Sequence, residues 1–317
     1  MASLTKGDHV VDGLPGSQID GQGQRSKVVP VRHYGRWIAA IPLLGVVVWI
    51  VKVVATTSTF GWPHVAHYFL SSEVLIGLLH TLELTVIAMA IGIALGCVLA
   101  IMRLSPNPIL KSVAAFYTWF FRGTPTLVQL IFWFNLAFVF PSLTLRIPFG
   151  PTFWHESTNS VMTPLVAAIL GLGLNEGAYM SEIVRAGILS VDEGQTEAAH
   201  AFGLSRMQTM RHIILPQAMR VIIPPTGNDT IGMLKYTSLA SVIAFPELLQ
   251  SVTLIYNQNF EIIPLLIVAS LWYIIVTSVL YVGQGMIERR FSRGSSRRAR
   301  VTYLGALFGS ARGRSKG

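Results

Sequence analysis

The chain has 317 residues, of which 52% are hydrophobic and only 12% are charged, and its net charge is +9. Soluble domains carry about 25% charged residues, so this composition excludes an ordinary soluble domain and indicates a protein solvated mainly by lipid. The basic residues flank long apolar segments and collect at the C-terminus, which argues against a nucleic-acid partner. The single cysteine, Cys97, excludes an internal disulfide.

Both ends of the chain are polar. We expect residues 1–36, which are rich in Gly, Ser and Gln, to form a disordered basic cytoplasmic tail, and residues 291–317 to form a second basic tail. The N-terminal segment does not resemble a secretory signal, because its apolar run starts too late and no small-residue cleavage site follows. We interpret both tails as solvated segments that fix topology; contact with anionic lipid heads is the alternative.

A membrane-spanning helix needs about 20 predominantly apolar residues. Six segments meet this requirement, and the third is interrupted at Arg122–Pro125: Trp37–Thr56, Leu78–Met102, Val113–Phe140, Val161–Ile183, Val221–Phe245 and Ile262–Val282. The expected fold class is therefore an all-α integral membrane protein with six transmembrane helices. Pro125, Pro224 and Pro225 are expected to break the helices that contain them.

The loops between these segments alternate in charge. Several Lys or Arg residues precede the first span and follow the second, fourth and sixth spans. Thr57–Ile76 and Pro246–Glu261 have none, and Pro141–Ser160 has only Arg146. Cytoplasmic loops retain Lys and Arg, so this alternation predicts six spans with both termini in the cytoplasm.

The second span carries small residues at every fourth position: Ala88, Gly92, Gly96 and Ala100. This spacing places them on one helix face, where another backbone can approach closely. We interpret the pattern as a packing surface.

The loop after the fourth span is the most informative segment. Thr196 is expected to cap a short helix, Glu197 to lie in its positively polarised first turn, and Gly203 to end it with positive φ. Such a helix, with one aromatic residue at Phe202, suits docking into a groove of a soluble partner. An interfacial helix lying on the bilayer is an equally good interpretation of these residues alone.

This loop resembles the cytoplasmic signature loop of binding-protein-dependent ABC permeases. The matching positions are Glu197, Ala198, Ala199, Gly203, Ile213, Leu215 and Pro216. The stretches Phe121–Gln129, Gly177–Gly187 and Leu234–Leu239 are similar to the polar amino acid branch of that family, which commonly has Asp where this chain has Tyr236. The resemblance favours the docking interpretation.

The resemblance covers residues 74–290 and implies a type I ABC importer permease fold, with the helix 37–56 as one extra N-terminal helix before a five-helix core. It implies a permease subunit that translocates polar amino acids across a bacterial cell membrane. The implied partners are a cytosolic ABC ATPase that binds ATP, an extracytoplasmic solute-binding protein and a second permease subunit, identical or not. This chain lacks a Walker A loop of its own, since Met233 follows the half-motif Gly227–Gly232.

The resemblance also implies roles within the loop. Glu197 pairs with a basic group of the ATPase, Phe202 fills its groove and Gly203 provides the turn. Leu215 and Pro216 complete the coupling loop. No ATP or other cofactor is expected on this chain itself.

Charged side chains inside spans cost on the order of 2.5–3.5 kcal/mol each, so they usually face a partner or a water-filled path. Candidates for the translocation path are Lys235, Thr237, Ser238, Glu83, Glu176 and Gln129. For Lys235, a structural ion pair is nearly as good an interpretation. Glu182 and Arg185 are expected to pair locally, because they are three residues apart.

Two alternatives have less support. A stand-alone secondary transporter or channel predicts a titratable relay and often inverted repeats, and no clear repeat is present. A membrane-embedded enzyme needs a catalytic set, and we find none. The nearest histidine pair, His64 and His67, lacks a third ligand, so we expect no metal site.

Overall fold

The computed structural model describes residues 17–19, 25–27, 34–147 and 151–291. By backbone contacts the chain divides into two units, Met1–Phe60 and Gly61–Gly317. The second unit thus begins before the expected core boundary at residue 74. The expected C-terminal tail lies almost wholly outside the described residues.

The first unit contains a short strand pair and one long helix. Strand β1 (Ser17–Ile19) pairs antiparallel with β2 (Arg25–Lys27), within the segment expected to be disordered. Helix α1 (Tyr34–Thr56) contains the predicted first span. From Ile41 onward its large apolar side chains are exposed, without a polar stripe, as expected of a helix surrounded by lipid.

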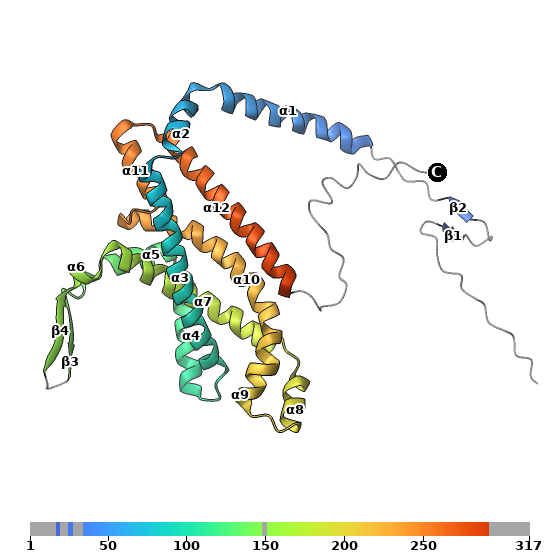
Figure 1. The fold of residues 1–317 in the computed structure, drawn as a ribbon, viewed down its shortest axis with the longest axis vertical. Coiled ribbons are helices and arrows are strands. Elements are labelled where there is room, and N and C mark those ends of the chain that lie inside the picture. Colours follow the sequence, from blue (N-terminus) through green and yellow to red (C-terminus); the bar gives the residue numbers. More distant parts are fainter. Residues whose placement is uncertain (1–16, 20–24, 28–33, 148–150, 292–317) are drawn as a thin grey trace, which may run out of the picture. The chain divides into compact units, whose positions relative to one another are not determined.

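The second unit is predominantly helical (Figure 1). Its elements in chain order are α2 (Trp62–Tyr68), α3 (Ser72–Leu104), α4 (Pro108–Gly123), α5 (Thr126–Phe134), β3 (Ser142–Arg146), β4 (Thr152–Ser157), α6 (Thr158–Val161), α7 (Pro164–Leu189), α8 (Glu193–Ala201), α9 (Arg206–Thr209), α10 (Leu215–Tyr236), α11 (Leu248–Asn259) and α12 (Ile262–Phe291). Short 3₁₀ turns cover Ser58–Phe60, Leu136–Phe138 and Thr237–Ile243, and Met210–Ile214 is π-helical.

Helix α3 packs along α7, and the small residues of α3 form the contact. Ala88 and Ala100 are fully buried. A Cβ added at Gly92 would collide with the side chain of Glu176, and one at Gly96 would lie 2.9 Å from the carbonyl carbon of Met180. The predicted packing surface is confirmed, because only small side chains allow this approach.

The predicted interruption of the third span is confirmed. Helix α4 ends at Gly123, and α5 starts after Pro125, whose extended backbone serves as its N-cap. The next loop contains the antiparallel β3–β4 hairpin, with Leu143 opposite Glu156. This hairpin adds a small β element to a fold expected to be all-α.

The expectation that Pro224 and Pro225 break their helix is wrong, since both lie inside the continuous helix α10. Neighbouring side chains satisfy nearby carbonyl groups: Gln284 on α12 donates to the Pro224 oxygen at 3.2 Å, and Thr226 donates to the Ile222 oxygen at 2.8 Å. A proline inside a helix lacks the N–H that would bond to the oxygen four residues earlier, here those of Arg220 and Val221, so these two contacts support α10 without replacing the lost bonds.

Three groups of buried residues hold the unit together. The first joins α3, α5, α7 and α10 through Leu84, Leu130, Leu172 and Met233. The second joins α3, α11 and α12 through Val74, Val252 and Val268, among others. The third joins α3, α7 and α10 through Ala100, Met180 and Ile222.

Helix α11 lies within Pro246–Glu261, the segment that the charge pattern predicts to be the loop between the last two spans. Its start is fixed by Glu247, whose carboxylate accepts hydrogen bonds from the backbone N–H groups of Leu249 and Gln250. The cap allows the chain to resume a helix after the turn at Ala244, which has φ 56°.

In the described part of the chain, two helices are by themselves long and apolar enough to span a membrane, α3 and α12; counting bent helix pairs as single spans gives up to four. Helices α4 and α5 are each shorter than the roughly 20 residues required. Helix α7 is long enough but carries the polar Asn175 and Glu176 near its middle. The total of six spans remains a prediction.

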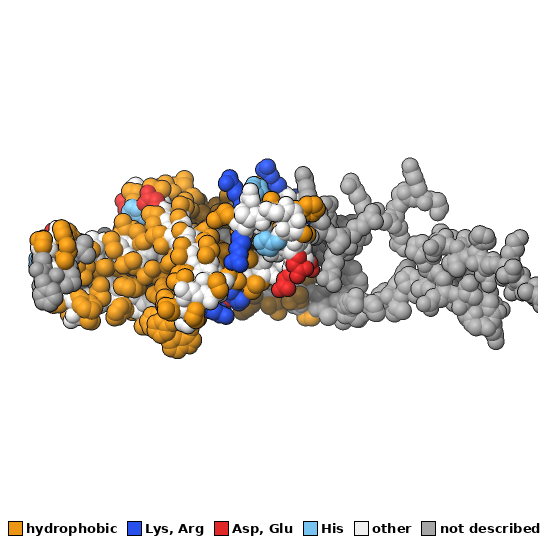
Figure 2. All heavy atoms as spheres, turned by 90° about the horizontal axis from the view of Figure 1, so that it is seen from below, with side chains coloured by type: hydrophobic (Ala, Val, Ile, Leu, Met, Phe, Trp, Pro, Cys, Tyr) orange, Lys and Arg blue, Asp and Glu red, His pale blue; other side chains and the backbone are white. Residues whose placement is uncertain are grey.

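Large apolar side chains are exposed along much of the second unit. Figure 2, which views the molecule from below, shows a broad hydrophobic surface beside a group of Lys and Arg side chains. Exposed apolar surface of this extent is typical of a protein that lies in lipid.

Candidate coupling loop and membrane path

Helix α8 begins earlier than expected. Its N-cap is Asp192, whose side chain accepts a hydrogen bond from the Gly194 N–H at 2.9 Å, so the helix starts at Glu193. The expectation that Thr196 is the cap and Glu197 the first-turn acid is wrong. Asp is a strong N-cap, and the negative charge of Glu193 suits the positively polarised first turn of a helix. The helix therefore has about one more turn before Glu197 than expected.

Helix α8 ends where the sequence predicted, just before Gly203. Gly203 has φ 77°, and its N–H donates to the His200 oxygen, while the Leu204 N–H donates to the Ala199 oxygen. This pair of bonds is the Schellman arrangement, which a left-handed residue completes. Gly203 has open space around its Cα, so its conformation, not its size, is what the turn requires.

A second short helix, α9, follows at once. Ser205 and Gln208 form a reciprocal capping box, with the Ser205 N–H donating to the Gln208 Oε1 at 2.8 Å. The sequence analysis did not predict this capping box, although Ser-x-x-Gln before an apolar stretch is its recognised signal. The π-helical segment Met210–Ile214 then leads into α10, whose first residues are Leu215 and Pro216.

The coupling loop, defined here as Asp192–Pro216, is anchored on one side and exposed on the other. Ala199 is buried where α8 packs against α9 and the π-helical segment. Gln217 on α10 donates to the Gln195 side chain at 3.4 Å. In contrast, Phe202 is 86% exposed and Met207 is 74% exposed. An ordered helix that presents apolar side chains outward is suited to bind a protein partner.

Glu197 and Ala198 are also exposed on α8, whereas Leu215 is only partly so, at 41%. The loop lies at the same end of the second unit as the turn between α3 and α4 (Figure 1). This is the end that the charge pattern assigns to the cytoplasm.

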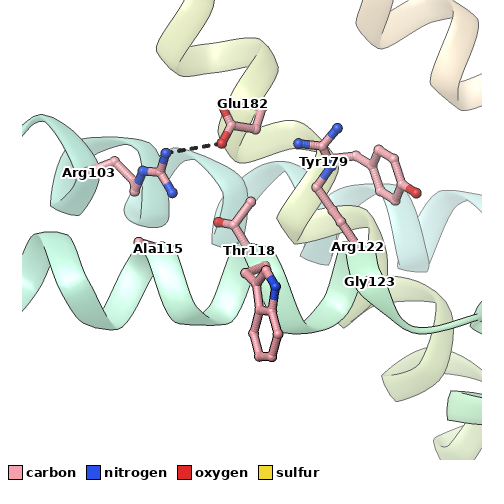
Figure 3. Close-up of a pocket in the computed structure, with 8 residues that line it drawn as sticks. Arg103, Ala115, Thr118, Arg122, Gly123, Tyr179 and Glu182 are labelled. Atoms are coloured by element: carbon pink, nitrogen blue, oxygen red, sulfur yellow. Dashed lines mark ion pairs between the residues drawn. The ribbon is translucent and has the colours of Figure 1, made fainter.

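A basic cluster lies where α3, α4 and α7 meet (Figure 3). The predicted Glu182–Arg185 pair is confirmed, with 2.7 Å between Oε2 and the Arg185 Nη2. Sequence reasoning missed Arg103, whose Nη2 lies 3.3 Å from the other oxygen of Glu182. The guanidinium of Arg122 lies 5.2 Å from the centre of the Tyr179 ring. The residues of this cluster come from three different helices, so no spacing pattern in the sequence could have predicted that they meet.

Gln129, a candidate for the path, is buried at the break between α4 and α5. Its amide donates to the backbone oxygens of Phe121 and Thr124 and to the Thr124 hydroxyl, at 2.7 to 3.1 Å. Asn175 on α7 donates to the Phe121 oxygen and to the Gln129 oxygen. The side-chain N–H groups of Gln129 therefore bond to backbone oxygens at the C-terminal end of α4, which fixes the break between α4 and α5.

Glu176, near the middle of α7, is buried against α3. Its Oε1 has no hydrogen-bond partner among the residues that the structure describes. Asp229 on α10 lies within electrostatic range of it. Asp229 was not among the sequence candidates, although its acidic side chain within a predicted span was the same signal that selected Lys235.

The other path candidates do not gather at one point. Lys235 is exposed in the last turn of α10. The hydroxyls of Thr237 and Ser238 donate to the oxygens of Leu234 and Lys235, so both bond within their own turn. Glu83 is exposed on α3.

Comparison with known proteins identifies the family. The family model described as binding-protein-dependent transport system inner membrane component matches residues 92–293. The arginine transport system permease protein ArgU of Corynebacterium glutamicum is 44% identical over 283 residues, covering 88% of this chain and 87% of that protein. The L-cystine transport system permease protein TcyB of Bacillus subtilis is 37% identical over 218 residues, covering 68% and 86%.

Solved structures agree with this. A chain in the crystal structure of an amino acid ABC transporter with histidines is 35% identical, with a TM-score of 0.58, and the match covers 69% of this chain and 94% of that one. A chain of the inward-facing MetNI methionine ABC transporter, at 18% identity and a TM-score of 0.53, shares the fold. The chain therefore belongs to the binding-protein-dependent transport system inner membrane component family, the multi-pass permease subunits of ABC importers.

Proposed function

We propose that this permease subunit imports a cationic amino acid, with arginine as the first candidate, and that a separate cytosolic ATPase drives it through the coupling loop. The observation that carries the coupling proposal is the combination of an anchored α8 with an 86% exposed Phe202 at its end. A side chain this exposed makes few contacts within the fold and is accessible to a partner.

The coupling loop is connected directly to a path helix. Helix α8 packs against the π-helical segment Met210–Ile214, which continues without a break into α10. Movement of α8 by a docked ATPase therefore shifts α10, which carries Asp229 and Lys235. This is a two-state element that nucleotide on the ATPase and the loaded binding protein both bias.

Two acidic side chains support a cationic substrate. Glu176 on α7 and Asp229 on α10 lie within electrostatic range of each other, both in predicted spans, where charged groups are costly. A passing guanidinium or ammonium group would offset that repulsion, whereas an acidic amino acid would increase it. The 44% identical arginine permease supports the same class.

In the proposed assembly, three kinds of partner join this subunit. A second permease subunit completes the path, an extracytoplasmic solute-binding protein delivers the amino acid, and two ATPase subunits bind and hydrolyse ATP. Both termini of this chain lie in the cytoplasm, consistent with the basic residues at the coupling-loop end. The chain itself performs no hydrolysis.

The test is reconstitution of this permease with its ATPase and binding protein in proteoliposomes. We expect ATP-dependent uptake of labelled arginine, with lysine or histidine competing better than glutamine, cystine or glutamate. Preferred uptake of an acidic or neutral amino acid would contradict the substrate class. ATP hydrolysis by the purified permease alone would contradict the division of roles.

A further inference from the structure

A pocket of about 470 Å³ opens between α3, α4 and α7, outside the coupling loop. Figure 3 shows Arg103, Arg122, Thr118, Tyr179 and Glu182 around it. Its volume is within the range of about 300–1,000 Å³ that small-molecule pockets span. We propose that this pocket binds the phosphate headgroup of an anionic phospholipid.

The charge around the pocket is unbalanced. The two oxygens of Glu182 are each engaged by an arginine, Arg103 at 3.3 Å and Arg185 at 2.7 Å. Arg122 has no carboxylate within ion-pair distance among the described residues and lies over the ring of Tyr179. Two guanidinium groups thus share the one carboxylate and a third, that of Arg122, has none, which leaves an excess of positive charge for an anion.

Guanidinium groups suit a phosphate. Each presents N–H donors in a planar fork that matches two phosphate oxygens, and each remains charged at any physiological pH. A phosphate between Arg103 and Arg122 would accept hydrogen bonds from the N–H groups of Arg122. Among the described residues, no carboxylate engages these groups. A basic pocket between membrane helices on the cytoplasmic side is a recognised setting for anionic lipid heads.

The surface beside the pocket suits acyl chains. Helix α4 exposes Trp119 at 70%, Phe116 at 64% and Phe120 at 44%. Trp119 also lines the pocket, so the polar and apolar surfaces meet at one residue. Aromatic residues at this kind of boundary are typical of the level where lipid headgroups begin. A lipid bound here would have its phosphate in the pocket and its chains along α4.

The site has a defined leaflet. Arg103 lies in the last turn of α3, beside the turn 105–107 that the charge pattern assigns to the cytoplasm, and Glu182 lies in the half of α7 that leads into the coupling loop. The lipid would therefore come from the inner leaflet. Through Arg103 and Arg122 it would bridge α3 and α4 and stabilise that contact.

The experiment uses the full permease purified with its ATPase, and counts bound lipid by native mass spectrometry after addition of equal amounts of phosphatidylglycerol and phosphatidylcholine. We expect selective retention of phosphatidylglycerol, and about tenfold weaker retention in the Arg122→Gln variant, the effect of losing one charge-assisted contact. Arg122→Lys should retain part of the binding. Lys111→Gln, an exposed basic residue of the same helix outside the pocket, is the matched control and should bind normally.

Three results would overturn the proposal. Equal retention of phosphatidylglycerol by Arg122→Gln and the wild type would show that the pocket is not the site. Complete displacement of the lipid by millimolar inorganic phosphate would indicate a site for free anions. A change in subunit stoichiometry of Arg122→Gln with unchanged lipid binding would indicate a protein interface.

Discussion

The Tyr273 hydroxyl donates a hydrogen bond to the Glu247 carboxylate at 2.9 Å, which joins α12 to the start of α11. Glu247 is fully buried, and its two oxygens also accept from the backbone N–H groups of Leu249 and Gln250 at 2.9 and 2.8 Å. A buried carboxylate is stable only when such donors satisfy it. This one holds together the end of the bundle opposite the coupling loop.

Replacing Glu247 with Ala should destabilise the protein. It removes an N-cap, which costs about 0.5–2 kcal/mol, and leaves the half-buried Tyr273 hydroxyl without its charged partner, which costs about 1–3 kcal/mol. Thermal unfolding in detergent measures the effect. The control, Tyr273→Phe, keeps the cap and should lose less stability. Equal stability of Glu247→Ala and the wild type would show that the cap contributes nothing.

Replacing Gly203 with Asp should prevent co-purification of the ATPase while membrane insertion persists. The new side chain must adopt φ 77° and places a negative charge at the negatively polarised end of α8. Gly203→Asn is the matched control, because Asn tolerates this conformation without the charge. Retained ATPase binding by Gly203→Asp would count against docking at this turn.

Replacing Phe202 with Ala should weaken ATPase binding by about tenfold or more, as loss of an aromatic anchor typically does, without changing the melting temperature. The side chain is 86% exposed, so the fold does not depend on it. Phe260→Ala is the control: it is 81% exposed but lies at the C-terminal end of α11, away from the coupling loop. Loss of binding in both variants would mean that the effect is not specific to α8.

Replacing Gln129 with Leu should impair assembly of the permease without altering which amino acid competes for uptake. The change leaves the Phe121 and Thr124 oxygens with fewer donors, at a cost of about 1–3 kcal/mol. Membrane abundance and a competition panel distinguish the two effects. If the variant reached normal membrane abundance but transported a different set of amino acids, Gln129 would contact the substrate in the path directly.

Replacing Lys235 with Ala should reduce the rate of uptake more than the amount of assembled complex. Lys235 is exposed at the end of α10 and has no carboxylate within ion-pair distance among the described residues. Proteoliposome uptake normalised to complex content measures this. Uptake kinetics equal to the wild type would remove Lys235 from the path and leave it a surface residue.

Sequence by itself determined the properties that depend on composition and local spacing. Membrane embedding follows from the shortage of charge, the packing face of α3 from small residues at every fourth position, and the turn at Gly203 from the conformational freedom of glycine. The break before α5 follows from Pro125. Each of these needs only a few neighbouring residues to be recognised.

The tertiary structure decided which side chains meet across helices. It joined Arg103 to Glu182, brought Asp229 near Glu176, and placed Gln129 at the end of α4 as a hydrogen-bond donor. It also kept α10 continuous through two prolines, which no local pattern predicted. Hydrogen-bond and charge partners far apart in the chain leave no local pattern, so only folding determines whether a polar residue in a span serves the path or the packing.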